Sequence, residues 1–237
     1  MLTTHPDQIH GMDLSPKTLC LTFDDGPGET IGDGPGPKTL KLAQYLREEG
    51  IVATFFAAGK HVEAHPRVLP EVIRLGHIVG NHSFDHPFMT RLYQHSSHEC
   101  IMEITRTTNL IKNLVPDHTM FFRAPYGDWS PELSAVMNKE LKDGMNYIGP
   151  IHWDINANDW ACWDKGETPE SCAEKYLREI EMVGRGIVVM HDSTSDNDNM
   201  KANNRTYETL RILVPPLKDA GYQFVAIDQI PGIKQQQ

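Results

Sequence analysis

Cysteine is scarce in this sequence, with 4 among 237 residues, and none of the four has zinc-knuckle spacing. This scarcity excludes a disulfide-stabilised scaffold at this chain length. Cys20, in an apolar run, and Cys100, in a helical pattern, are expected to be buried free thiols. Cys162 and Cys172 flank a polar loop, and both a disulfide closing that loop and two thiols fit the sequence, because the compartment decides between them.

Long apolar runs and clustered positive charge are also missing. No run approaches the roughly 20 residues of a membrane-spanning helix, and the first residues lack the pattern of a secretory signal. The formal net charge is −10 without a basic block, which disfavours nucleic acid and anionic membranes as partners and suits a neutral or cationic ligand. The absence of a Gly-x-Ser-x-Gly motif argues against a serine esterase.

The chain does contain a regular alternation of two patterns, without internal repeats or linkers. Its length predicts one domain over residues 1–237, with a core of about 17–230. Apolar, β-rich runs fall at 17–23, 52–57, 77–80, 120–123, 147–153, 186–190 and 223–227. Helical patterns lie at 38–49, 68–75, about 98–115, from 130 onward, about 169–183 and about 206–220.

Strands that alternate with helices imply a parallel α/β sheet, closed as a barrel or left open and doubly wound. An open sheet gathers ligands chiefly at one switch point, whereas a barrel builds its site from the carboxyl ends of many strands. Here polar residues follow nearly every strand: Asp24, Asp25, His82, Arg123, Asp154, Asp159, His191 and Asp192. We therefore predict an α/β barrel of seven parallel strands with its active site at their carboxyl ends.

Asp24 and Asp25 end the first apolar run, directly before Gly26-Pro27. Neighbouring strand residues point to opposite faces, but this turn lets both carboxylates reach the barrel mouth. A solvated acidic turn is the alternative, since Asp-Asp-Gly-Pro is good turn chemistry. The apolar strand ahead of the pair favours a functional interpretation, with one carboxylate neutralised by a metal and the other by a cationic side chain.

His82 and His86 are spaced so that their imidazoles can meet on one ion from a helical turn or a tight loop. A carboxylate from a second segment would complete three protein ligands and leave room for water, as in catalytic metal sites. The alternative is a pair of surface or structural histidines, because twelve histidines make chance pairs easy.

Arg123 ends the fourth strand beside a proline-fixed turn that contains Tyr126. An arginine in a barrel mouth needs an anion, which Asp24 could supply; an ordinary salt bridge is the alternative. The backbone N–H of Tyr126 could stabilise an oxyanion.

His191 ends a buried strand and is a candidate general acid. A carboxylate such as Asp159 would tune its protonation. Trp160 could offer an aromatic wall to a sugar ring, although tryptophans more often belong to the core.

These stretches, in this order, resemble the polysaccharide deacetylase family (carbohydrate esterase family 4, the NodB-homology domain). The resemblance covers about Thr18 to Ile227. Its motifs are Thr-Phe-Asp-Asp-Gly-Pro at 22–27, His-Ser-x-x-His at 82–86, Arg-Ala-Pro-Tyr at 123–126, Asp-Trp at 159–160 and Val-Met-His at 189–191. It implies an irregular (β/α)7 barrel with parallel strands.

The resemblance also implies a role for each matching position. One divalent metal ion, usually Zn2+ with Co2+ or Ni2+ able to substitute, would be bound by Asp25, His82 and His86. Asp24 would be the general base, held ionised by Arg123.

On the other side of the reacting amide, the resemblance makes His191 the general acid and Asp159 the residue that orients it. The Tyr126 N–H would stabilise the oxyanion, and Tyr126 would also contact the substrate. Trp160 and Val189 would enclose the acetyl methyl group. Val189 stands where leucine is common, which should reshape the acetyl pocket slightly.

The favoured function is hydrolysis of N-acetyl groups from an N-acetylglucosamine-containing glycan, chitin or chitooligosaccharide ahead of peptidoglycan because the acidic chain suits a polyanionic polymer less well. O-deacetylation of acetylated xylan would use the same site. An inactive carbohydrate-binding pseudoenzyme would be expected to have lost a base, ligand or acid, and all matching positions are present here. Such a partner glycan favours an extracellular or periplasmic location, and a cytoplasmic one stays open because no signal is visible.

Overall fold

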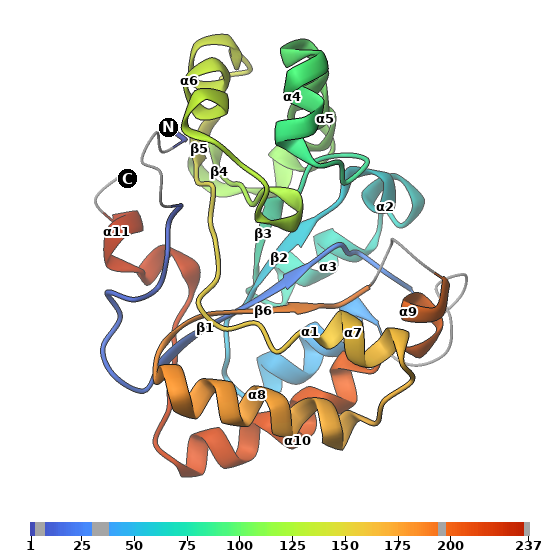
Figure 1. The fold of residues 1–237 in the computed structure, drawn as a ribbon, viewed down its shortest axis with the longest axis vertical. Coiled ribbons are helices and arrows are strands. Elements are labelled where there is room, and N and C mark those ends of the chain that lie inside the picture. Colours follow the sequence, from blue (N-terminus) through green and yellow to red (C-terminus); the bar gives the residue numbers. More distant parts are fainter. Residues whose placement is uncertain (3–7, 30–37, 194–197, 235–237) are drawn as a thin grey trace.

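The computed structural model describes residues 1–2, 8–29, 38–193 and 198–234. Its strands alternate with helices along most of the chain (Figure 1). The strands are β1 Thr18–Asp24, β2 Thr54–Ala57, β3 Ile78–Asn81, β4 Thr119–Phe121, β5 Asn146–Ile148, β6 Gly186–His191 and β7 Gln223–Phe224. The α-helices are α1 Thr39–Glu48, α2 Gly59–Ala64, α3 Val68–Arg74, α4 Met89–His95, α5 Ser97–Ile111, α6 Pro131–Glu140, α7 Asp159–Asp164, α8 Pro169–Val183, α9 Asp198–Asn203, α10 Thr206–Asp219 and α11 Pro231–Lys234.

All paired strands are parallel, as the alternating patterns predict. The main sheet has the order β3-β2-β1-β6, with β7 beside the start of β1, and β4 and β5 form a separate pair. Single bridges join these pieces: Asn81 pairs with Phe122, and Ile155 pairs with Val188. The two sheets are therefore joined into a ring partly through isolated bridges. The fold is an irregular α/β barrel, which confirms the predicted class.

An amino-terminal segment, which the sequence patterns do not predict as part of the sheet, runs beside the chain that follows β5. Leu2 bridges Gly149, and Ile9 bridges Ile151. The Ile9 N–H donates to the carbonyl of Pro150 at 2.9 Å, and the His152 N–H donates to the carbonyl of Ile9 at 2.8 Å. This segment satisfies backbone groups that the short β5 leaves without a strand partner.

Strand β1 is buried along its whole length, and its side chains alternate between two environments. Leu19, Leu21 and Phe23 pack in the larger hydrophobic cluster with the surrounding helices, whereas Cys20 packs with the smaller cluster that includes Phe56. Asp24 shares the face of Cys20 because side chains two residues apart in a strand point the same way. The register pairs Asp24 with His191 of β6, so both side chains lie on that same face.

Several element boundaries differ from the sequence patterns. The expected strand over 147–153 ends at Ile148, because Gly149 has a φ of 151° and Pro150 lacks an N–H for a ladder. The expected strand over 223–227 keeps only Gln223 and Phe224. Helices α2, α4, α7, α9 and α11 were not predicted; each has four to seven residues, too few for a clear period.

No helix within the described ranges combines the length and apolarity needed to cross a membrane. The described cysteines are all buried free thiols, as expected for Cys20 and Cys100. Of the two possibilities for Cys162 and Cys172, the structure has the free thiols.

Candidate active site and metal centre

A cavity of about 420 Å³ opens at the carboxyl ends of the strands. It brings together eight residues that the sequence singles out: Asp24, Asp25, His82, His86, Tyr126, Trp160, Val189 and His191. Arg123 and Asp159, also singled out, are fully buried behind two of these. Three lining residues had no role in the sequence interpretation: Trp153, Asn156 and Met200.

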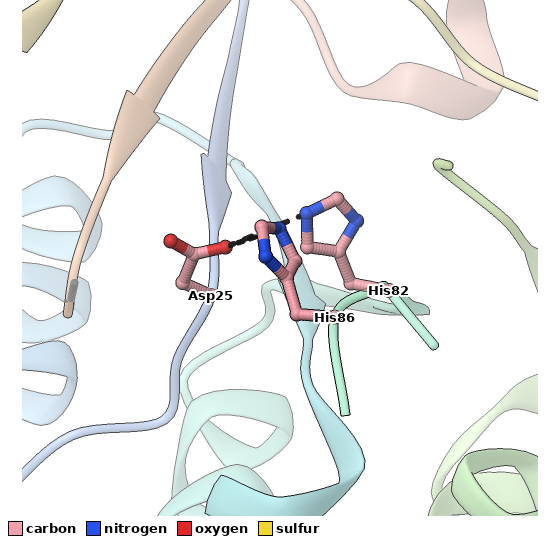
Figure 2. A group of neighbouring side chains, drawn as sticks. All are labelled: Asp25, His82 and His86. Atoms are coloured by element: carbon pink, nitrogen blue, oxygen red, sulfur yellow. Dashed lines mark ion pairs between the residues drawn. The ribbon is translucent and has the colours of Figure 1, made fainter. Parts of the chain in front are cut away.

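Asp25, His82 and His86 converge at one side of this cavity (Figure 2). One donor atom from each lies within 4.8 Å of the others. Asp25 Oδ1 is 3.2 Å from His86 Nε2 and 3.5 Å from His82 Nε2. Ligands about 2.0–2.2 Å from a tetrahedral zinc ion lie roughly 3.3–3.6 Å apart, so the spacing suits such an ion.

The surroundings of these three side chains also suit a cation. His82 Nδ1 is 2.9 Å from the backbone carbonyl of Arg123, which can only accept, so Nδ1 carries a proton and Nε2 is the nitrogen that faces the candidate metal site. A metal-binding histidine is commonly oriented in this way. Oδ1 of Asp25 is buried and accepts no hydrogen bond from the described residues. A cation there would satisfy it.

Electrostatics favour an ionised Asp25. Burial alone would raise the pKa of its carboxyl, but His86, His82 and His191 stabilise the charged form and hold the pKa well below its usual value. The carboxylate is therefore available as a ligand across the neutral pH range.

The two histidines sit in a tight loop and not on a helical turn. Ser83 and His86 both have positive φ, 63° and 64°. Helix α5 fixes the loop: Glu103 Oε2 accepts the N–H groups of Phe84 and Asp85 at 2.9 and 2.8 Å. The positive φ values aim two imidazoles at one point, which a spacing of four residues allows but does not require.

Asp24 is held by a buried arginine. Arg123 Nη1 donates to Asp24 Oδ1 at 2.7 Å and to the hydroxyl of Thr22 at 2.7 Å. The other guanidinium nitrogens donate to the carbonyls of Ile151 and His152, each at 3.1 Å. The second carboxylate oxygen, Asp24 Oδ2, lies 3.7 Å from His82 Nε2 and therefore faces the candidate metal ligands.

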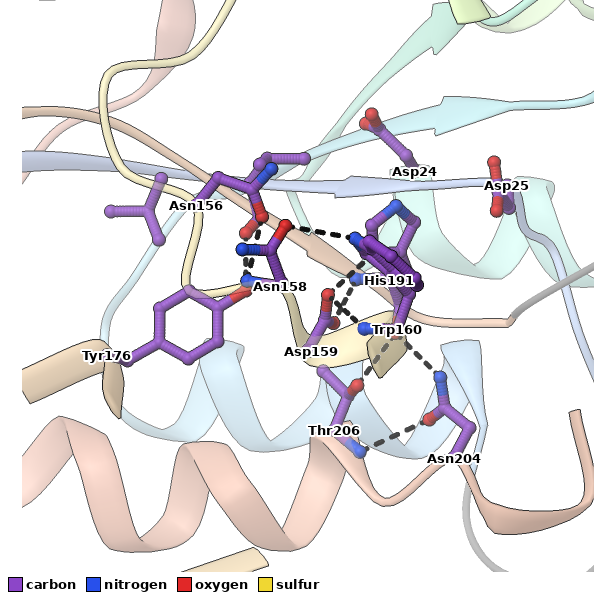
Figure 3. Close-up of polar contacts among 12 residues, drawn as sticks. Asp24, Asp25, Asn156, Asn158, Asp159, Trp160, Tyr176, His191, Asn204 and Thr206 are labelled. Atoms are coloured by element: carbon purple, nitrogen blue, oxygen red, sulfur yellow. Dashed lines mark hydrogen bonds and ion pairs between the residues drawn. The ribbon is translucent and has the colours of Figure 1, made fainter. Parts of the chain in front are cut away.

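Asp159 holds His191 in an equivalent way (Figure 3). Its Oδ1 is 2.7 Å from His191 Nδ1, and its Oδ2 accepts the His191 backbone N–H at 2.8 Å. Burial would lower the pKa of His191, but the charge and hydrogen bond of Asp159, with Asp25 and Asp24, raise that pKa to about 10. His191 therefore carries a proton at neutral pH.

A second buried acid, Asp192, stabilises the turn after Asp25. Its Oδ2 accepts the hydroxyl hydrogen of Thr39, whose oxygen accepts the Gly28 N–H at 2.7 Å. A Cβ on Gly26 would overlap the Asp192 carboxylate, so the close approach requires glycine there. Burial raises the pKa of Asp192 to about 7 despite the hydrogen bond from Thr39.

Aromatic rings form two sides of the cavity rim. Tyr126, with a φ of 58°, packs on His86 at a centroid distance of 4.5 Å and stacks on Phe88 at 4.0 Å. Trp160 also lines the cavity and is 42 % exposed, and Nε1 of its indole donates to Asn158 Oδ1 at 3.2 Å. Exposed aromatic faces of this kind suit the apolar faces of a sugar ring.

Comparison with known proteins identifies the family of this chain. Residues 11–143 match the family described as polysaccharide deacetylase. A chitooligosaccharide deacetylase of Azorhizobium caulinodans is 29 % identical over 216 residues, which cover 87 % of this chain and 90 % of that protein. The peptidoglycan-N-acetylglucosamine deacetylase PgdA of Listeria monocytogenes is 30 % identical over 93 % of this chain, but the match spans only 40 % of PgdA.

A solved structure supports the fold. Bacillus subtilis PdaA, a family 4 carbohydrate esterase, superimposes with a TM-score of 0.70 at 23 % identity, covering 92 % of this chain and 82 % of that one. Fold and site together define a barrel hydrolase with a candidate three-ligand metal centre. The chain belongs to the polysaccharide deacetylase family.

Proposed function

We propose that this protein is a metal-dependent deacetylase that removes N-acetyl groups from chitooligosaccharides or chitin. One observation supports the proposal: Asp24, paired with the buried Arg123, and His191, paired with the buried Asp159, line the same cavity as Asp25, His82 and His86. Asp24 is an acceptor beside the cluster, and His191 is a protonated donor on the same face. Amide hydrolysis needs one group of each kind.

Asp25, His82 and His86 would hold the ion, and we propose Zn2+ from the nitrogen–oxygen donor set. When bound, such an ion polarises the amide carbonyl and lowers the pKa of water. Asp24, positioned by Arg123, takes the proton of the attacking water. The backbone N–H of Tyr126 stabilises the charge that develops on the carbonyl oxygen.

Proton delivery completes the reaction. His191, positioned by Asp159, gives its proton to the amide nitrogen as the carbon–nitrogen bond breaks. The products are acetate and a free sugar amine. Val189 and Trp160 form the apolar wall against which the acetyl methyl packs.

The choice of glycan rests on the lengths of the matched relatives and on the net charge of this chain. The relative matched along 90 % of its length bears the name chitooligosaccharide deacetylase, whereas PgdA is a longer protein. The net charge of −10 also suits a neutral chitooligosaccharide better than an anionic wall polymer.

The test is acetate release from a panel of chitotetraose, peptidoglycan and acetylated xylan, with products identified by mass spectrometry. Metal content is measured on the same sample. We expect loss of acetyl groups from chitotetraose and about one equivalent of bound zinc. Activity on acetylated xylan alone would contradict the proposal and favour an O-deacetylase, and activity on none of the three would favour a pseudoenzyme.

The protonation of His191 gives a pH prediction. Because the acid must carry its proton, kcat falls as pH rises through the pKa of His191 in the substrate complex. Asp159→Asn removes the main cause of the raised pKa, so the alkaline limb of the kcat profile should move to lower pH. The measurement is kcat against pH for both enzymes; an unchanged alkaline limb would show that His191 is not the acid.

A further inference from the structure

Asn156, in the segment between β5 and α7, presents a fixed amide to the cavity (Figure 3). Its backbone N–H donates to Glu179 Oε1 at 2.9 Å, which anchors the residue to α8. Its Oδ1 accepts the backbone N–H of Asn158 at 3.0 Å. A backbone N–H can only donate, so the accepting atom must be the amide oxygen, and the other branch of the side chain is the NH2 group.

Asn158, which fixes the orientation of this amide, is itself held in place. Asn158 has a φ of 55°, and its own Oδ1 accepts Nε1 of Trp160 at 3.2 Å. Asn156, Asn158 and Trp160 thus form one chain of hydrogen bonds, and its two end residues, Asn156 and Trp160, line the cavity. The NH2 group of Asn156 points away from Asn158 in Figure 3 and donates no hydrogen bond to any residue in the described ranges.

A cavity donor held in one orientation is suited to recognise an oxygen acceptor. Asp24 supplies an acceptor to the cavity, and Asp25, His82 and His86 form the candidate metal site. The Asn156 amide adds a neutral donor within the same cavity as Trp160. Ligand pockets combine aromatic or apolar walls with a few polar groups that orient the ligand. The hydroxyl oxygen of a sugar is a neutral acceptor for such a donor.

We propose that Asn156 is a substrate-recognition residue that donates a hydrogen bond from its NH2 group to a hydroxyl oxygen of the acetylated sugar. This inference rests on the proposed deacetylase function and assigns part of its sugar specificity to one side chain. Because the donor contacts the sugar and not the reacting amide, its contribution should be made equally in the ground state and the transition state.

The test compares Asn156→Asp and Asn156→Ala with the wild type, all loaded with zinc. Asn156→Asp keeps the oxygen that accepts the Asn158 N–H and removes the donor; Asn156→Ala removes both. Asn113→Asp, an exposed position at the opposite end of the barrel, makes the same change of charge as a control. Kinetics are measured with chitotetraose and with 4-nitrophenyl acetate, an acetyl ester that has no sugar. Thermal unfolding and zinc content are checked for each protein.

For chitotetraose, we expect both Asn156 variants to raise KM by about 3- to 10-fold with kcat unchanged, the size of one lost neutral hydrogen bond. Rates with 4-nitrophenyl acetate and all parameters of the control should stay within about twofold. A fall in kcat at constant KM, or an equal loss with both substrates, would overturn the inference by showing that Asn156 only supports the reacting groups. An unchanged KM in an active enzyme would overturn it as well. If the wild type deacetylates no N-acetylated glycan, the proposed function fails and the inference fails with it.

Discussion

Asp24→Asn is expected to lower kcat by about 10²- to 10⁴-fold while leaving the metal content unchanged. The amide oxygen of asparagine can still accept the hydrogen bond that Arg123 Nη1 donates at 2.7 Å. The other branch becomes an NH2 group, which cannot take a proton from water. Since Asp24 lies outside the group of Asp25, His82 and His86, the three proposed metal ligands stay intact.

The measurement is steady-state turnover of chitotetraose together with bound zinc per protein. Asp13→Asn, at an exposed position, makes the same change of charge and should leave turnover unaltered. A kcat within tenfold of the wild type would remove Asp24 from the role of base. Loss of zinc from Asp24→Asn would instead place Asp24 among the ligands.

His86→Ala is expected to lower metal affinity by more than about 100-fold, and turnover with it, because the loss of even an outer-shell partner costs 10- to 100-fold. The His86 Nε2 atom lies 3.2 Å from Asp25 Oδ1, and its removal leaves two of three ligands. Zinc should therefore raise the thermal unfolding midpoint of the wild type and not that of the variant, since only the former binds the ion in the folded state.

His98→Ala, at an exposed position on α5, is the matched histidine control and should bind zinc like the wild type. A chelator should reduce the wild type to the turnover of His86→Ala, and added zinc should restore it. Turnover by the wild type that survives complete metal removal would refute the metal-dependent reaction.

The clustering of Asp24 and His191 could be expected from the sequence because both residues end apolar, buried strands. In a parallel sheet the carboxyl ends of strands share one edge, so such residues meet without further information. The pairing of β1 with β6 also puts the two side chains on one face. Neither fact depends on the identity of any loop residue.

Other features could not be expected in this way. The spacing of His82 and His86 allowed a helical turn or a tight loop, and the loop is selected by Glu103, which lies on α5 and binds two of its N–H groups. Thr39 donates its hydroxyl hydrogen to Asp192, which lies 153 residues away in the sequence. Asn156 gave no sequence signal beyond a polar residue near Asp159, because the role proposed for it depends on which branch of its amide already makes a hydrogen bond.

The sequence by itself determined the alternation of elements, the parallel α/β class and the residues at the strand ends, because apolar periodicity and strand-end position are local properties. Only the tertiary structure decided how the ring closes, through bridges at Phe122 and Ile155, and which side chains hold Asp24 and His191 in place and line the cavity. These depend on hydrogen bonds between segments far apart in the chain. The geometry of such bonds is fixed only when the core packs, and no local pattern encodes it.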